Sequence, residues 1–170
     1  MTRVAVIGNA GGGKSTLCRK LSTTLSLPHY PIDMIQWQPG WIAAHPDEVR
    51  QKHAQIISSD TWIIDGWGSW EMITTRFAAA DTIIVVDHPL YVHYWWAIKR
   101  QVKSLFSSSP DWPVGYPLWP MTWTLFKIIW AVHRQARPQL LQLVDTLREQ
   151  KRIIHIRSPE ELRAFLQGLP

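Results

Sequence analysis

The stretch Gly8-Asn-Ala-Gly-Gly-Gly-Lys14-Ser15 decides how the whole chain is interpreted. It matches the phosphate-binding pattern G-x-x-x-x-G-K-[ST] at every fixed position. Backbone N–H groups can point together at an anion only in conformations that glycine adopts at low cost, with no side chains in the way. The alternative is a plain strand-to-helix turn, which needs one or two glycines rather than four and has no use for Lys14 and Ser15. We therefore predict that this loop binds the phosphates of a nucleoside triphosphate.

The sequence on both sides of the loop supports this prediction. The run from Arg3 to Gly8 is apolar and short, as in a buried strand. Leu17 and Leu21 begin a four-residue repeat that marks one face of a helix, whose amino end would face the phosphates. Lys14 is expected to reach the β- and γ-phosphates, and Ser15 to place its hydroxyl on Mg²⁺. The predicted nucleotide-binding residues are Gly8, Ala10, Gly11, Gly12, Gly13, Lys14, Ser15 and Thr16.

The rest of the chain alternates between strand and helix patterns. Further strands are predicted at His29–Asp33, Thr61–Asp65, Thr82–Asp87 and Arg152–Ile156. Pro31 weakens the first of these, which we expect at an edge of the sheet. Helices are predicted from Pro46 to Ile57, at Trp70–Ala79, Leu90–Phe106 and Thr122–Ala136, again beyond Pro138, and after the capping sequence Ser158-Pro-Glu-Glu161. This order predicts an α/β fold in which helices cover both faces of a parallel sheet.

The composition indicates one globular domain covering residues 1–170, with an apolar share of 46% and a charged share of 18%. The single cysteine, Cys18, excludes an intrachain disulfide and any all-cysteine zinc site, and it fits a reducing, cytoplasmic location. We see no signal peptide and no run of about 18 apolar residues, so we expect no transmembrane segment. The net charge of +5 is scattered along the chain, which does not favour nucleic acid as a partner. The sequence does not predict the oligomeric state.

Eleven tryptophans stand out, and five of them lie between Tyr91 and Trp123. The simplest interpretation is a core and lid filled with large side chains. Two alternatives are stacking on nucleic-acid bases and a surface that rests on a membrane interface.

Three aspartates follow predicted strands. Asp65 would lie beside the loop if its strand neighbours the first strand, where it could hold a Mg²⁺-bound water; the alternative is a cap on the next helix. Asp33 could face the acceptor, as a base for a hydroxyl or as a hydrogen-bond partner, or be an ordinary turn aspartate. Asp87 is interpreted as structural.

Five basic residues are candidate clamps for the transferring phosphoryl group. Guanidinium groups suit the charge that builds on its equatorial oxygens, although any one of these side chains could simply be solvated. The candidates are Arg76, Arg100, Lys103, Arg134 and Arg137. The histidines show no metal-ligand spacing, and His29, His53 and His155 are interpreted as packing residues.

These motifs together resemble adenylate-kinase-related P-loop kinases, specifically the small group described as topology-modulation-protein-like. The resemblance spans nearly the whole chain and implies a P-loop NTPase fold of the nucleoside-monophosphate-kinase type, with three layers, five parallel strands in the order 2-3-1-4-5, and a helical lid. It rests on Gly8–Thr16, on Asp33 followed by Trp37-Gln-Pro-Gly-Trp41, on Trp62–Gly66, on Arg76 before Ala80-Asp81-Thr82, and on Arg134-Gln-Ala-Arg-Pro138.

The resemblance also divides the chain by role. It implies an acceptor-binding segment at about residues 34–60 and a lid at about residues 100–137, and it places Asp65 beside Lys14. True adenylate kinases have a proline-arginine pair soon after the Asp-Gly of the third strand, whereas Trp67-Gly68 follows here. This departure disfavours an AMP pocket and lets Trp67 reshape the acceptor site. The expected acceptor contacts are Asp33, Trp37, Trp41, Trp67 and Arg76.

Two functions stay open from the sequence. The first is an ATP- and Mg²⁺-dependent phosphotransferase acting on a nucleotide, nucleoside or other small metabolite, with Lys14, Asp33, Arg100, Arg134 and Arg137 as catalytic residues. The second is a nucleotide-binding regulator with little catalysis, whose lid engages a protein, membrane or DNA. A switch GTPase is disfavoured because the chain has no Asn-Lys-x-Asp motif. Neither the acceptor nor a preference for adenine over guanine is predicted.

Overall fold

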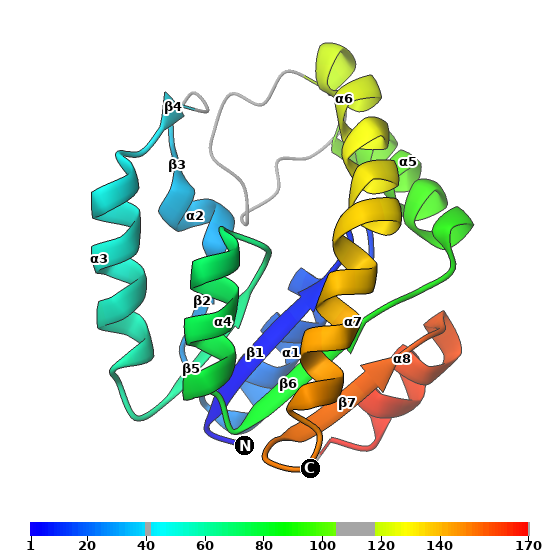
Figure 1. The fold of residues 1–170 in the computed structure, drawn as a ribbon. Helices are drawn as coiled ribbons and strands as arrows, with labels where there is room; N and C mark the ends of the chain where they lie inside the picture. Colours follow the sequence, from blue (N-terminus) through cyan, green and yellow to red (C-terminus); the bar gives the residue numbers. More distant parts are fainter. Residues whose placement is uncertain (40–41, 105–117, 170) are drawn as a thin grey trace.

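The computed structural model describes residues 1–39, 42–104 and 118–169 (Figure 1). A parallel sheet of five strands forms its centre, in the order β2-β5-β1-β6-β7. The strands are His29–Pro31 (β2), Trp62–Asp65 (β5), Arg3–Gly8 (β1), Thr82–Val86 (β6) and Arg152–Ile156 (β7). Counted along the chain within this sheet, the order is 2-3-1-4-5, so the predicted topology and the α/β class are confirmed.

Helices cover both faces of the sheet, which gives three layers (Figure 1). On one face, α1 (Lys14–Leu25) and α8 (Pro159–Gln167) contribute Leu21 and Leu162 to a core shared with Val4 of β1 and Ile156 of β7. On the other face lie α3 (Pro46–Ile57), α4 (Trp70–Ala79) and α7 (Arg137–Thr146), which contribute Val49, Phe77 and Leu140 to the second core. Strands buried on both faces must be apolar throughout, which explains why β1 and β6 read as continuous apolar runs.

Two helices begin as their sequences predict. Pro46 opens α3 and is followed by Asp47 and Glu48 in the first turn, where acidic groups favour the positive end of the helix dipole. The Ser158 hydroxyl caps α8 by accepting a hydrogen bond from the Glu161 N–H at 3.1 Å.

The second predicted strand is shorter than expected. It ends at Pro31, and Ile32–Gln36 forms a short helix, α2, so that Asp33 lies in a first helical turn and not at a strand end. Proline cannot donate a hydrogen bond to the neighbouring strand, so the strand ends at Pro31. An acidic residue is favourable near a helix amino end, so Asp33 favours the start of α2. Beyond α2, Trp37–Gln38 (β3) and Ile42–Ala43 (β4) form a small antiparallel hairpin.

Two helices rise beyond the carboxyl edge of the sheet as a helical arm (Figure 1). These are α5 (Leu90–Ser104) and α6 (Leu118–Ala131), which pack together through Ala97, Leu125 and Ile129. The predicted end of α5 at Phe106 lies outside the described residues, as does the following stretch to residue 117. The start of α6 at Leu118 precedes the predicted Thr122, because proline, here Pro120, is tolerated in a first helical turn.

A change of helical pitch separates α6 from α7. Val132–Ala136 forms a π-helical turn, and α7 then starts at Arg137 with Pro138 in its first turn. The predicted restart of the helix at Pro138 is therefore confirmed. A π-turn inside a helix is uncommon and is frequently found beside functional sites.

Candidate phosphate-binding and acceptor site

The loop between β1 and α1 depends on glycine at two positions with left-handed backbone. Gly11 and Gly13 have φ angles of 69° and 79°. A Cβ atom built on Gly11 would lie 2.5 Å from the carbonyl oxygen of His93, well inside van der Waals contact. Glycine is thus required in this loop for two reasons: the backbone is left-handed, and at Gly11 there is no room for a Cβ atom.

The amino end of α1 is left open to an anion. Its N-cap is Gly13, which has no side chain to cap the first turn. The first N–H groups of a helix have no intrahelical partner, and they carry the positive end of the helix dipole. An oxyanion placed between Gly13 and Ser15 would supply the missing acceptors.

Three successive carbonyl groups of the loop are held by side-chain donors. Trp67 Nε1 donates to Gly8 O at 2.9 Å, Lys14 Nζ donates to Asn9 O at 2.9 Å, and His93 Nδ1 donates to Ala10 O at 3.0 Å. The C=O and N–H of a planar trans peptide point in opposite directions. Holding these three oxygens therefore fixes the orientation of the peptide groups at the start of the loop, including the N–H of Gly11 that follows Ala10 O.

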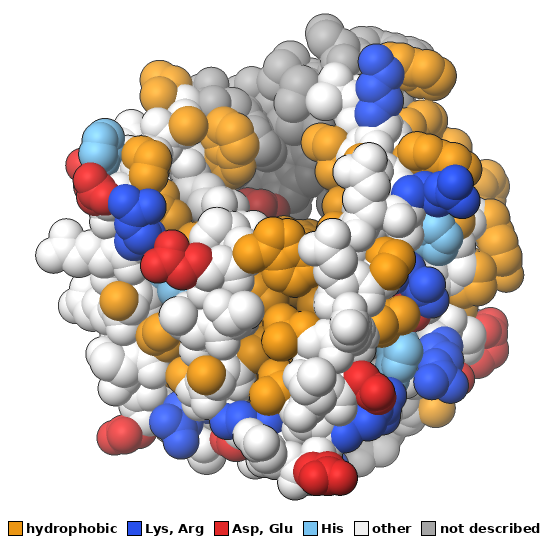
Figure 2. Space-filling model, viewed as in Figure 1, with side chains coloured by type: hydrophobic (Ala, Val, Ile, Leu, Met, Phe, Trp, Pro, Cys, Tyr) orange, Lys and Arg blue, Asp and Glu red, His pale blue; other side chains and the backbone are white. Residues whose placement is uncertain are grey.

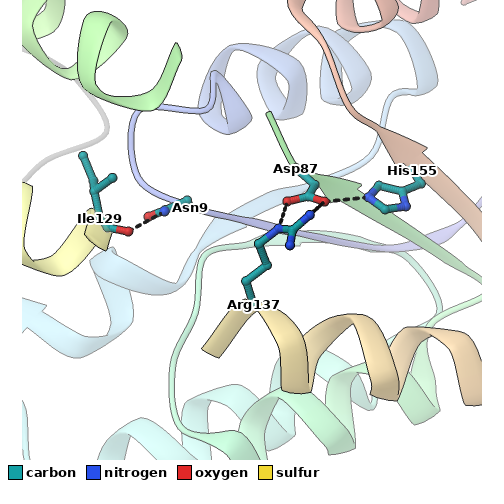
Figure 3. A network of polar contacts seen from close by, with 5 residues as sticks. All are labelled: Asn9, Asp87, Ile129, Arg137 and His155. Atoms are coloured by element: carbon teal, nitrogen blue, oxygen red, sulfur yellow. Dashed lines mark hydrogen bonds and ion pairs between the residues drawn. The ribbon is translucent and has the colours of Figure 1, made fainter. Parts of the chain in front are cut away.

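Asn9 joins the loop to the helical arm, which the sequence pattern did not indicate. Its side-chain amide donates to Ile129 O at 2.8 Å, and its Oδ1 accepts the Ala10 N–H at 2.8 Å (Figure 3). The contact is buried and links positions 120 residues apart. Asn9 occupies a variable position of the motif, so nothing in the pattern marks it.

His93 is a second residue that sequence reasoning missed. It comes from the first turn of α5 and is fully buried. Burial lowers the pKa of its imidazole to about 4, and the nearby Lys14 charge acts in the same direction. His93 is therefore neutral at pH 7 and serves as a fixed hydrogen-bond donor to the loop.

Asp65 stands at the end of β5, where the sequence predicted a carboxylate. Strands β5 and β1 are neighbours, with Asp65 opposite Val6, so the predicted neighbourhood of the two strands is confirmed and the magnesium role of Asp65 stays a prediction. The carboxylate is buried, and its Oδ1 lies 3.2 Å from His29 Nε2. A carboxylate here and the Ser15 hydroxyl at the start of α1 are hard oxygen donors, as Mg²⁺ requires.

Asp65 also belongs to a mixed cluster of possible metal ligands. One ligand atom from each of Cys18, His29 and Asp65 lies within 4.8 Å of the other two. A thiol and an imidazole suit zinc better than magnesium. The buried guanidinium of Arg76 interacts with the Asp65 carboxylate and partly balances its charge.

The structure corrects the role expected for Arg76. Its side chain is fully buried, with Nη2 donating to the carbonyls of Gly66 at 2.9 Å and Trp67 at 3.3 Å. Burial lowers the pKa of this guanidinium to about 10, although the Asp65 charge opposes the shift. Arg76 supports the loop after β5 from beneath, so the prediction that it contacts the acceptor or clamps the transferring group is wrong.

Arg137 is likewise engaged elsewhere. Its Nε and Nη2 donate to the two oxygens of Asp87 at 2.6 and 2.8 Å, and His155 Nε2 lies 3.1 Å from the same carboxylate (Figure 3). Burial raises the pKa of Asp87, but the hydrogen bonds from Arg137 and His155 outweigh it and lower the pKa overall. Asp87 is thus structural, as predicted, and Arg137 would have to leave this bidentate ion pair to act as a phosphoryl clamp, so that role stays a prediction.

The other predicted clamps are distributed over the arm. Arg134 is exposed, with its guanidinium carbon 5.6 Å from the centroid of the Trp130 ring. The backbones of Arg100 and Lys103 lie in α5, but their side chains fall outside the described part of the chain. Arg134 is therefore the predicted clamp whose described side chain is open to solvent.

Three of the predicted acceptor residues, Asp33, Trp37 and Trp67, follow the carboxyl ends of β2 and β5. Asp33 is exposed on α2, and Trp37 is half-buried where α2 meets β3. Trp41 lies outside the described residues. Trp67 lines a crevice with Gly8, Asn9, His93, His133 and Arg137. Hydrophobic side chains gather at the centre of the face shown in Figure 2, between the helices on its two sides.

Comparison with family models found no match, and comparison with curated proteins found none either. The expected membership in the topology-modulation-protein-like group therefore stays a prediction.

Solved structures do resemble the chain. Shikimate kinase from Bacteroides thetaiotaomicron has a TM-score of 0.57 at 14% identity, covering 99% of this chain and 96% of its own. The chain has the fold of small P-loop kinases. Shikimate kinase from Acinetobacter baumannii, solved with shikimate, gives 0.56 at 15% identity, covering 98% and 89%. A gluconokinase from Sinorhizobium meliloti gives 0.54 at 14% identity, covering 99% and 91%. At these identities the likeness is one of fold.

Proposed function

We propose that this protein transfers the γ-phosphoryl group of ATP to a hydroxyl group of a small metabolite. The observation that carries the proposal is the loop at Gly8–Ser15, in which side-chain donors hold three successive carbonyls and no side chain caps the following helix. The proposal of a hydroxyl acceptor is supported by the similar structures named above, which act on shikimate and gluconate, because both of these compounds bear hydroxyl groups.

The donor side of the site uses residues of the loop and of β5. The N–H groups from Gly11 to Ser15 and the Lys14 ammonium would bind the phosphates. The Ser15 hydroxyl and the Asp65 carboxylate would hold Mg²⁺, which, when bound, neutralises charge on the β- and γ-phosphates. Lys14 must exchange its bond to the Asn9 carbonyl for phosphate oxygens as ATP enters.

The acceptor side needs a group that removes a proton. The Asp33 carboxylate is exposed at the start of the acceptor-binding segment, residues 34–60, and would accept the proton of the attacking hydroxyl. Trp37 and Trp67 would bound the pocket on either side. Arg134, and Arg100 where α5 enters the lid, would then meet the charge on the transferring group when the lid, residues 100–137, closes and excludes water.

A screen for acceptor-dependent ADP formation tests the proposal. Hydroxylated metabolites, nucleosides and nucleotides are each supplied with ATP and Mg²⁺, and ADP is measured against an acceptor-free blank. We expect at least one hydroxylated metabolite to raise ADP formation and the Lys14→Ala variant to abolish it. Normal turnover by Lys14→Ala, or stimulation by nucleotides alone, would contradict the proposal as stated.

A further inference from the structure

The outer face of α5 is a stripe of exposed apolar side chains. Tyr91, Trp95, Ile98 and Val102 follow one another at spacings of four, three and four residues, which aligns them along one side of a helix. All four are between 41% and 73% exposed. The opposite side of α5 is buried, with Val92, His93 and Ala97 in contact with the rest of the molecule.

A second stripe runs along α6 and into the π-helical turn. Trp123, Lys127, Trp130 and Arg134 repeat the same spacing, so that aromatic and basic residues alternate. Trp123 and Trp130 are at least half exposed, whereas Leu125 and Ile129 face α5. We name these two stripes together the arm face.

Cations lie directly beside the exposed indoles. Lys99 Nζ is 4.9 Å from the centroid of the Trp95 ring, and Arg134 stacks near Trp130 as described above. Hydrophobic side chains and Lys or Arg side chains lie next to each other over this part of the molecule (Figure 2).

All of the net positive charge of the protein is concentrated in this region. Between His88 and Val144 the only acidic residue is Asp111, against six basic residues, namely Lys99, Arg100, Lys103, Lys127, Arg134 and Arg137. The remainder of the chain carries twelve basic and twelve acidic residues and is therefore neutral. Arg137 in this stretch is paired with Asp87, and the described cations that remain beside the exposed aromatic residues are Lys99, Lys127 and Arg134.

We infer that the arm face docks on the surface of a bilayer that contains anionic lipids. Indole and phenol rings favour the boundary between headgroups and acyl chains, and lysine and arginine stems reach from there to lipid phosphates. Basic residues near an anionic surface add electrostatic attraction. No helix in the described part of the chain has both the length and the hydrophobicity to cross a membrane, so the contact is peripheral.

Nucleic acid and a second protein surface fit these residues less well. A duplex would neutralise the cations, but it offers no apolar surface to Ile98, Val102 or Ile128, all of which are exposed. A second copy of the chain would bring the same positive charges together, which opposes association. The surface of an anionic bilayer offers acyl chains to the apolar side chains and lipid phosphates to the cationic side chains.

Sedimentation of the full-length protein with sucrose-loaded vesicles tests this inference. Vesicles of phosphatidylcholine with about one third phosphatidylglycerol are compared with pure phosphatidylcholine at physiological salt. We expect at least roughly tenfold stronger binding to the anionic vesicles, weakened at high salt. We expect a double Trp95→Ser, Trp123→Ser variant to lose roughly tenfold or more of that binding.

The matched control is Trp70→Ser, which removes a partly exposed tryptophan from α4, away from the arm. It should bind vesicles like the unaltered protein, and circular dichroism should show that every variant is folded. Equal binding to both vesicle types, no binding to either, or an equal loss in Trp70→Ser would overturn the inference. So would tighter binding to duplex DNA than to vesicles, or a dimer in solution that the double variant abolishes.

Discussion

Gly11 holds the phosphate-binding loop in a backbone conformation that other residues adopt only at a cost. In Gly11→Ala, the left-handed φ of 69° and the close approach of the His93 carbonyl act together against the native loop. We expect the dissociation constant for ATP to rise at least about tenfold, since a cost of about 1–2 kcal/mol has that effect. Isothermal titration calorimetry measures it. Gly168→Ala, at a surface glycine with negative φ, is the control and should bind ATP normally.

The role proposed for Asp33 predicts that its substitution affects the rate of phosphoryl transfer far more than the binding of ATP. If its carboxylate accepts the acceptor's proton, Asp33→Asn should lower kcat by roughly 10²- to 10⁴-fold, the usual contribution of a general base. ATP affinity should change far less than kcat, because the loop residues proposed to bind the phosphates stay unaltered while Asp33 lies on α2. Steady-state kinetics with the acceptor found in the screen gives the answer, and an unaltered kcat would remove Asp33 from the mechanism.

The lowered pKa values of the buried histidines His53 and His93 predict how the free energy of unfolding depends on pH. Burial lowers the pKa of both His53 and His93 to about 4 in the folded protein. The unfolded chain takes up these protons below about pH 6.5, whereas the folded chain does not until about pH 4. Unfolding is therefore favoured as the pH falls through this window, by about 2 kcal/mol for each histidine at pH 5.

Thermal unfolding between pH 8 and pH 5 measures this effect. The melting temperature should fall toward pH 5, and His53→Phe should flatten the slope. His45→Asn, which replaces an exposed histidine, serves as the control and should keep the full slope. A slope that His53→Phe leaves unaltered would show that the buried imidazoles do not control the pH dependence.

The contacts of individual arginine side chains could not be predicted from the sequence. Arg76 and Arg137 have the residue type that a phosphate clamp needs, and their spacing on helices fitted that role. Only the tertiary structure reveals that Arg76 is buried beneath Gly66 and that Arg137 pairs with Asp87. The Lys14 and Ser15 positions, by contrast, follow from a local motif, because neighbours in sequence build the loop themselves.

At the scale of elements, Asn9 couples the loop to α6. Removing its amide in Asn9→Ala leaves the Ile129 carbonyl buried without this donor, which we expect to cost about 1–3 kcal/mol of unfolding free energy. Urea denaturation measures the loss. Tyr94→Phe removes a longer bond of 3.5 Å between α5 and α6 and should cost clearly less. Equal losses in the two variants would argue against a special link between the loop and the arm.

Elements with a strong local signal were predicted well, and those shaped by long-range contacts were not. The run of β-branched residues predicts the strand β6, and the leucine repeat predicts the helix α1, without any long-range contact. The boundary between β2 and α2 was wrong because Pro31 ended the strand two residues early. The π-turn at Val132–Ala136 has no sequence signature beyond the nearby Pro138 and was not predicted.

At the scale of the whole molecule, the order of elements was enough to predict the fold. Parallel strands joined by helices allow few topologies, and the observed sheet matches the predicted order. The excess of basic residues between His88 and Val144 can be counted in the sequence and was overlooked; the packing of α5 against α6 adds that Lys99 and Lys127 lie on neighbouring helices. The interpretation of the tryptophans changes accordingly: Trp62 fills the core, whereas Trp95, Trp123 and Trp130 face solvent.

A crystal structure with a non-hydrolysable ATP analogue and Mg²⁺ measures most directly whether the loop at Gly8–Ser15 holds the triphosphate. We expect the β- and γ-phosphates to accept hydrogen bonds from the N–H groups of Gly11 to Ser15, with Lys14 moved from the Asn9 carbonyl to the phosphates. A nucleotide bound at another surface, while Lys14 still donates to Asn9 and the loop is empty, would contradict the proposed donor site.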